Sequence, residues 1–144
     1  MRAMIALARN SLSDSPRPLM QIRDISESER IPGKFLEQIL LTLKNAGLLN
    51  SRMGVGGGYF LARKPQDISL GQVFRVLDGP VAPVRCVSRM AYQPCDCPDE
   101  ATCGLRLAMG DVRNAVAGIL DGTSLADVIQ RVDAQKKSKF KKKA

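Results

Sequence analysis

Histidine and tryptophan are absent from this chain of 144 residues, and its aromatic residues are limited to four phenylalanines and two tyrosines. Without histidine, the chain has no imidazole base, no Cys–His nucleophile pair and no histidine-containing metal site. The scarcity of aromatic residues predicts an aliphatic core like that of small helical proteins. An enzyme is therefore not the expected class.

Long apolar runs are also missing. No stretch approaches the ~18 residues that suggest a membrane-spanning helix. The run Met4–Ala8 is followed at once by Arg9 and is too short for a signal peptide. We therefore expect a cytoplasmic protein without membrane contact, organised as one compact domain or as a small domain with an appended helix.

The net charge of +8 is concentrated at one end of the sequence. Six lysines lie in residues 136–144, and without them the chain has 16 basic and 14 acidic residues. We expect residues 133–144 to form a basic, disordered tail that attracts phosphate. Net charge alone is weak evidence for specific DNA binding.

Residues 1–79 have the pattern of a DNA-binding module. Residues 1–10 predict a helix, and a proline-containing linker follows at 11–18. A short helix ending near Glu29 and a second from about Pro32 to Ala46, capped by Gly47, have helix-turn-helix geometry. An ordinary pair of packed helices is the alternative. The second helix has an apolar stripe of Phe35, Leu36, Ile39, Leu40 and Leu43, and an outer face of Lys34, Glu37, Gln38 and Lys44.

Two short strands, 48–52 and 59–62, flank the glycine-rich segment 53–58. This segment is not a nucleotide-binding loop, because it joins two strands and lacks a following Gly-Lys-Ser/Thr. A β-wing that lies along DNA is the better interpretation, with backbone N–H groups close to phosphates. The predicted DNA-binding residues are Lys34, Phe35, Glu37, Gln38, Arg52, Gly56, Gly57, Gly58 and Tyr59.

Three further helices are predicted. Ser69 and Gln72 fit a capping box that starts a helix ending at Asp78. A longer helix, 105–120, keeps one apolar face, for which a dimer seam is favoured over internal packing. Thr123 or Ser124 caps a last short helix, 125–132. The apolar face of the long helix consists of Leu105, Ala108, Val112, Ala115, Val116 and Ile119.

All four cysteines lie in the loop between the DNA-binding module and the long helix: Cys86, Cys95, Cys97 and Cys103. Four cysteines in a chain without secretory features favour metal or redox chemistry over structural disulfides. They suit an iron–sulfur cluster or a tetrahedral zinc site, and reduced thiols without metal are a third possibility. Asp96, Asp99 and Glu100 surround them and offer carboxylates as alternative hard ligands.

In combination, these segments resemble the Rrf2 family of bacterial transcription regulators, which includes IscR- and NsrR-like members. The resemblance covers about residues 1–132. The segments that carry it are Arg2-Ala3-Met4, Phe35 to Leu40, Leu43 to Leu48, Gly54 to Tyr59, Ile68 to Val73, and Arg85-Cys86.

The resemblance implies a mainly α fold with a small β-hairpin, namely a winged helix-turn-helix (1–79), a cysteine-bearing sensor loop (80–104), and a long dimerisation helix with a short C-terminal helix (105–132). It implies a homodimer that binds a double-stranded DNA operator, with repression the favoured direction of control. It also implies sensing of redox state, iron or nitric oxide through an iron–sulfur cluster, [2Fe–2S] rather than [4Fe–4S]. A zinc-bound or metal-free regulator without sensing and a structural zinc-binding interaction module are the alternatives.

Several positions depart from the family pattern. The family commonly has arginine directly before the first glycine of the wing, where this chain has Met53, with Arg52 one residue earlier. The turn before Ile31 often has glycine, and here it is Arg30. Cys97 and Cys103 keep the family's cysteine interval, whereas Cys86 lies further back. These three are the best-matched cluster ligands, and Cys95 is the candidate for the fourth or a replacement for Cys97.

Overall fold

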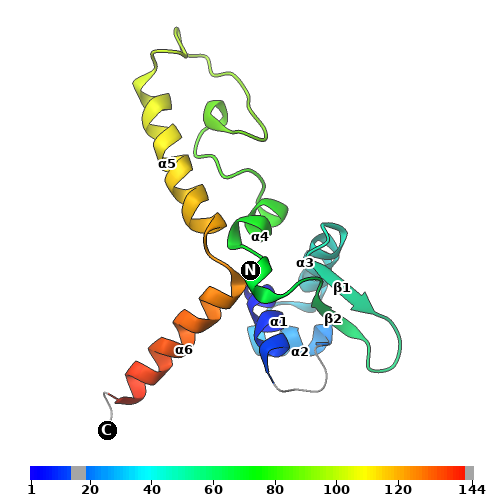
Figure 1. Ribbon diagram of the computed structural model, residues 1–144. Coiled ribbons are helices and arrows are strands. Elements are labelled where there is room, and N and C mark those ends of the chain that lie inside the picture. Colours follow the sequence, from blue (N-terminus) through cyan, green and yellow to red (C-terminus); the bar gives the residue numbers. More distant parts are fainter. Residues whose placement is uncertain (14–18, 142–144) are drawn as a thin grey trace.

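The computed structural model describes residues 1–13 and 19–141, with side chains up to residue 138. It confirms the mainly α fold with one small β-hairpin (Figure 1). The predicted linker lies partly outside the described residues, at 14–18. In chain order the elements are α1 (Arg2–Leu12), α2 (Ile22–Glu29), α3 (Gly33–Asn45), β1 (Leu49–Arg52), β2 (Gly58–Leu61), η1 (Pro65–Asp67), α4 (Leu70–Leu77), η2 (Arg85–Val87), α5 (Gly104–Asp121) and α6 (Leu125–Lys141).

The core joins both ends of the chain. α1, α2, α3, the hairpin and α4 pack around one aliphatic cluster, and the first turns of α6 add Leu125 and Ile129 to it. Fully buried side chains include Met4, Leu7, Ile25, Leu36, Leu40, Leu43, Leu49 and Ile68. Phe35, expected in the stripe of α3, is instead 58% exposed, because it lies on the side of the helix that faces away from the cluster.

The chain returns from α5 to this core by backbone pairing. The N–H of Leu70 donates to the carbonyl of Thr123 (2.8 Å), and the N–H of Leu125 donates to Ile68 (2.9 Å). Ser69 and Gln72 form the predicted capping box at α4. Ser124 caps α6 by accepting from the N–H of Asp127. The two ends of α5 are therefore anchored differently, one at the core and the other at the cysteine loop.

The prediction that the last helix ends at Val132 is wrong, since α6 continues to Lys141. The segment after Val132 is rich in Ala, Gln and Lys, which favour helix when no proline or glycine interrupts them. Figure 1 shows α6 extending away from the core in one direction, and α5 with the cysteine loop in another.

The turn between α2 and α3 is closed by Ser26. Its carbonyl accepts from the N–H of Ile31 (3.0 Å), and its hydroxyl donates back to the carbonyl of Ile31 (2.7 Å). Arg30 lies between them with φ 53°, in the left-handed region that favours glycine. The turn thus holds a non-glycine residue in an unfavourable backbone conformation.

Replacing Arg30 with glycine is therefore expected to raise the free energy of unfolding by about 1 kcal/mol, because it relieves the left-handed penalty at this position. Urea denaturation with an unchanged m-value would measure the gain. The same substitution at Arg23, inside α2, serves as the control and should lower stability by about 1 kcal/mol. A loss of stability in Arg30→Gly would contradict the prediction.

Candidate nucleic-acid interface and cysteine loop

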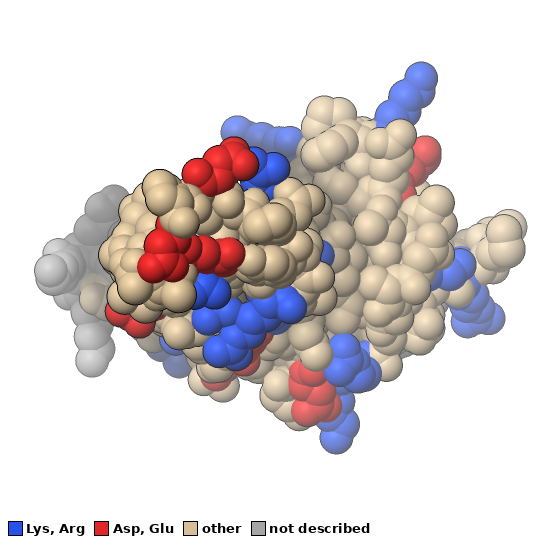
Figure 2. All heavy atoms as spheres, turned by 90° about the horizontal axis from the view of Figure 1, so that it is seen from above, with Lys and Arg blue, Asp and Glu red and all other residues tan. Residues whose placement is uncertain are grey.

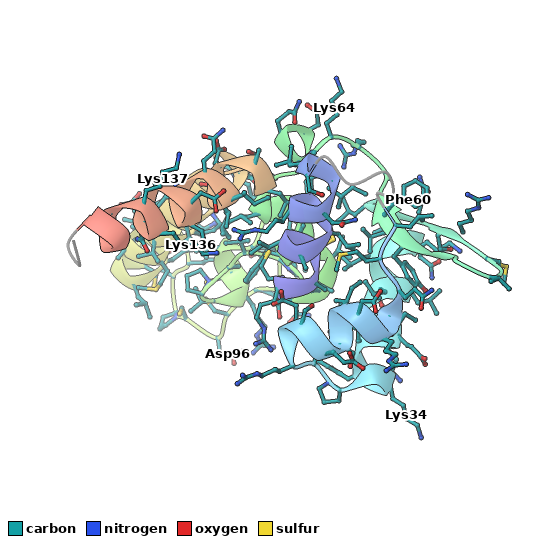
Figure 3. The ribbon with its side chains drawn as sticks, turned by 90° about the horizontal axis from the view of Figure 1, so that it is seen from below. Lys34, Phe60, Lys64, Asp96, Lys136 and Lys137 are labelled. Atoms are coloured by element: carbon teal, nitrogen blue, oxygen red, sulfur yellow. The ribbon has the colours of Figure 1, made fainter. Side chains whose placement is uncertain are left out.

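The outer face of α3 is free of internal packing. Lys34, Phe35, Glu37 and Gln38 are all exposed, while Leu36, Leu40 and Leu43 fasten the opposite face to the core. Figure 3 shows Lys34 pointing away from the molecule at the start of the helix. The structure therefore brings the four predicted side chains together on one accessible surface, in the second helix of the helix-turn-helix pair.

The hairpin between β1 and β2 projects as a wing. The strands are antiparallel, with Leu49 opposite Leu61 and Arg52 opposite Gly58. Arg52 is exposed, and at the tip the exposed fractions of Met53 and Val55 are 94% and 111%. The N–H of Gly57 donates to the carbonyl of Gly54 (2.9 Å). Because that N–H is already bonded within the turn, Arg52 is better placed than Gly57 to bind a phosphate.

Gly58 and Tyr59 join the wing to the chain segment at Met20. Tyr59 exchanges two backbone hydrogen bonds with Met20, at 2.8 and 3.0 Å, and its half-buried side chain packs on the core. A Cβ at Gly58 would lie 2.4 Å from the carbonyl oxygen of Met20. Glycine at 58 is therefore explained by the close approach of two backbone segments.

Gly58→Ala is expected to lower the free energy of unfolding by about 2 kcal/mol, because the added Cβ has a fixed position and the atoms it would meet, at Met20 and Gln21, belong to the backbone and cannot rotate away. Thermal or urea unfolding followed by circular dichroism would measure it. Gly33→Ala is the control, since a Cβ there meets nothing within 4 Å. Equal stability of the two variants would show that the segment of Met20 moves freely.

The cysteine loop holds four free thiols, of which Cys86 is buried and Cys97 is exposed. Three pairs of thiols lie close enough for one thiol to influence the pKa of the other: Cys86 and Cys95, Cys95 and Cys97, and Cys97 and Cys103. η2, which contains Cys86, packs against α5. The structure thus places all four predicted ligands in one neighbourhood at the far end of α5.

The thiols differ in acidity. Burial raises the pKa of the Cys86 thiol. Hydrogen bonding with Cys95 is the main cause that raises the pKa of Cys97 to about 12, and the same contact lowers the pKa of Cys95. The thiolate form of Cys95 is therefore stabilised by hydrogen bonds that the neighbouring thiols donate to its sulfur.

Two of the nearby carboxylates are occupied by other groups. Asp99 accepts from the hydroxyl of Thr102 and from the N–H of Ala101, and these hydrogen bonds lower its pKa. Glu100 accepts from the hydroxyl of Tyr92 (2.7 Å) and pairs with Arg106 (3.1 Å). To act as hard metal ligands, the carboxylates of Asp99 and Glu100 would first have to break these contacts.

The donor set fits a thiophilic metal or cluster, because the loop gathers four free cysteines and thiolates are the usual ligands of such a group. Within residues 1–13 and 19–141, however, no three Cys, Asp or Glu side chains converge around one metal-sized position. The loop therefore has the right chemistry, and its present conformation does not point the thiols at a common centre.

An ion pair that the sequence did not predict connects α4 to α5. Both terminal nitrogens of Arg75 contact the carboxylate of Asp121, at 2.6 and 2.7 Å. The carboxylate of Asp121 lies directly over Gly71, so a side chain at position 71 would displace it from its place beside Arg75. The pair lowers the pKa of Asp121. Its partners are 46 residues apart, so no local pattern could have indicated it.

Charges of both signs gather around the cysteine loop. Figure 2, which looks down on this end of the molecule, shows acidic side chains next to basic ones.

Among the helices that the structure describes, none is long and apolar enough to cross a membrane.

Comparison with known proteins identifies the architecture. Residues 1–131 match the family model Rrf2, described as "Iron-dependent Transcriptional regulator". A putative rrf2-like HTH-type transcriptional regulator of Rhodobacter capsulatus is 41% identical over 130 residues, which are 90% of this chain and 86% of that protein.

Two solved structures have the same fold. CymR, the global cysteine regulator of B. subtilis, superimposes with a TM-score of 0.69 at 31% identity, covering 89% of this chain and 88% of that one. T. potens IscR gives a TM-score of 0.69 at 28% identity, over 93% and 83%. Winged-helix regulators of this kind bind DNA and are not enzymes. The chain belongs to the Rrf2 family of transcriptional regulators.

Proposed function

We propose that this protein is a homodimeric, sequence-specific repressor in the bacterial cytoplasm whose operator binding responds to the state of an iron–sulfur cluster. Cys86, Cys95, Cys97 and Cys103 would hold the cluster. The observation that carries the proposal is the combination, in one chain, of an unobstructed helix face on α3 with four free cysteines gathered in one loop beside α5. The family description as iron-dependent supports the same assignment.

Base reading is proposed for the exposed face of α3 in the major groove. Gln38 can form a bidentate hydrogen bond with adenine, and Glu37 can accept from the amino group of cytosine. Lys34 adds charge beside a phosphate, and Phe35 offers an apolar contact of the kind that reads a thymine methyl group. Arg52, on the wing, would fix the register by binding a phosphate.

The second copy is proposed to bind along α5. No α5 side chain is buried, although Leu105, Val112, Val116 and Ile119 are large and apolar, with 41–68% of their surface exposed. At about 1.5 Å per residue, the 18 residues of α5 are long enough for a seam of about 27 Å. Such a dimer would carry two recognition helices, whose separation must match two operator half-sites.

Coupling between the loop and DNA would pass along α5. η2 packs against α5 near the thiols, and the Arg75–Asp121 pair fixes its other end to α4. A bound cluster would give the loop a centre that responds to redox state, iron or nitric oxide. Cys86 would then be drawn toward the other thiols, and α5 would transmit the shift to the separation of the two recognition helices.

Operator binding tests the DNA-reading part of the proposal. Gln38→Ala is expected to weaken binding of a selected operator by about 1–3 kcal/mol and to relax preference at one base position. Arg52→Gln should instead weaken all DNA sequences alike and reduce the salt dependence. Binding-site selection followed by footprinting in a salt series measures both effects. If Gln38→Ala leaves affinity and preference unchanged, α3 is not the reading helix.

A metal-free or zinc-bound regulator is the second candidate. It is favoured by one observation: among the residues that the structure describes, the thiols do not converge on a shared metal-sized position. Anaerobic purification followed by visible absorption and metal analysis separates the two. A coloured protein with iron and sulfide supports the cluster, whereas a colourless protein with stoichiometric zinc contradicts it. Family membership disfavours the third hypothesis, an interaction module that does not bind DNA.

A further inference from the structure

Two arginines, one in the cysteine loop and one in α5, have no carboxylate partner among the residues that the structure describes. Arg89, in the loop, and Arg113, in α5, both donate to the amide oxygen of Asn114, at 3.4 and 2.7 Å. Among the residues that the structure describes, neither forms an ion pair. The Nε of Arg113 is buried and has no hydrogen-bond partner. The amide oxygen of Asn114, which carries no charge, therefore holds the guanidinium groups of Arg89 and Arg113 near each other. The Nε of Arg113 is left without an acceptor among the described residues.

These arginines line a cavity of about 400 Å³ between the loop and α5. Its wall includes the apolar side chains of Val87 and Leu107 and the hydroxyl of the buried Ser88. A smaller hollow of about 180 Å³ also borders Arg89, Arg113 and Asn114 and reaches the Arg75–Asp121 pair. The larger cavity lies in the size range of small-molecule sites, ~300–1,000 Å³.

The charge around the larger cavity is unbalanced. Arg106 also lines it, but its charge is compensated by Glu100 at 3.1 Å. The hydroxyl of Tyr92 also hydrogen-bonds to Glu100. One carboxylate, Asp111, lines the cavity and forms no ion pair within the described part of the chain. Arg89 and Arg113 together exceed it by one positive charge.

We propose that this cavity binds a small organic molecule with an oxyanion group, carboxylate or phosphate. The guanidinium groups of Arg89 and Arg113 would hold the oxyanion, whose oxygens suit their planar donors and would satisfy the buried Nε. Val87 and Leu107 would contact the apolar part of the ligand. The bound molecule bridges the loop and α5, and so acts on the same route as the thiols. Its effect on DNA binding rests on the proposed function, whereas the binding itself does not.

Calorimetric titration of the full-length protein at constant ionic strength tests the proposal. Sulfate and phosphate serve as bare oxyanions, and succinate and glycerol phosphate as oxyanions with an organic body. The organic probes are expected to bind more tightly than the bare ions. Arg89→Gln and Arg113→Gln should each lower their affinity about tenfold, the effect of losing one charged hydrogen-bond partner. Arg131→Gln, an equal charge change at an exposed position of α6, should leave affinity unchanged.

Three outcomes would overturn the site. They are no binding of any probe, equal loss of affinity in Arg131→Gln and Arg113→Gln, and a change of oligomeric state in Arg113→Gln by light scattering. The last would mean that the arginines pair with carboxylates of a second copy. Arg89→Gln keeps the test valid if Arg113→Gln does not fold, because Arg89 is exposed. Anion binding that leaves operator affinity unchanged would contradict the coupling and not the DNA-binding function.

Discussion

Val116→Asp is expected to convert the proposed dimer into monomers and to lower operator affinity on the order of 1,000-fold. Val116 lies near the middle of α5, where it is 41% exposed in the single chain. In a helix-to-helix seam it would be covered by the partner, and a carboxylate there would lose its water without gaining a charge partner. Two such groups, one from each copy, would also face each other.

DNA affinity falls because the two DNA-binding domains are no longer held together in one dimer. A dimer that binds one half-site holds its second head at high effective concentration over the other half-site, whereas a monomer has no such advantage. The single chain should still fold, because Val116 is not part of the core cluster. Monomers with an unchanged circular dichroism spectrum are therefore expected.

Light scattering gives the oligomeric state of this variant, and a mobility shift assay gives its affinity for full operators and half-sites. Val132→Asp is the matched control, since Val132 is a 37% exposed valine on α6, away from the proposed seam. It should remain dimeric and bind normally. If Val116→Asp is dimeric as well, the apolar face of α5 is not the interface.

The elements of the DNA-binding half follow closely from the sequence because their signals are local. The stripe of α3, the capping box at Ser69 and the glycine-rich wing each lie within a few residues, and each is found where the pattern predicts it. Phe35 is the exception, since the pattern places it in the stripe and the structure leaves it exposed. Only the position of the neighbouring helices decides that it is exposed.

The contacts that α5 makes with the loop and with α4 depend on distant pairs and could not be predicted in this way. Asn114 accepts from Arg89 across 25 residues, and Arg75 meets Asp121 across 46. Charged residues such as these are common on exposed helix faces, so their sequence alone does not indicate a partner. The position of α6 is similar, since Leu125 and Ile129 reveal an apolar face but not that it joins the core of α1.

The cysteines lie between these two cases. Four cysteines in a chain without secretory features indicate a metal or redox site, and the structure groups them in one loop, yet among the described residues they do not converge on one metal-sized position. A cluster needs its ligands around a common centre. Cluster binding would therefore require the segment between Cys86 and Cys103 to reorganise, and such a change is what a sensing loop needs in order to transmit a signal to α5.

Single cysteine-to-serine variants are expected to separate the ligands from the bystander. Cys86→Ser, Cys97→Ser and Cys103→Ser should each lose nearly all bound iron and sulfide, because a serine hydroxyl is a poor replacement for a thiolate in a cluster. Cys95→Ser should lose it equally if Cys95 is the fourth ligand, and should keep it if Asp96 or another group takes that place. Iron, sulfide and visible absorption after anaerobic purification measure the result.

Asp96→Asn is the matched control for changes to the loop that leave every sulfur in place, because Asp96 is exposed between Cys95 and Cys97. It should retain the cluster when Cys95 is the fourth ligand. Cys97 is exposed and Cys95 and Cys103 are half-buried, so their serine variants should keep the fold, and the melting temperature of the metal-free forms checks this. If all four serine variants contain as much iron and sulfide as the unaltered chain, the cysteine loop does not hold the cluster. The four thiols would then have to act by themselves, with Cys95, whose pKa is lowered, as the most reactive of them.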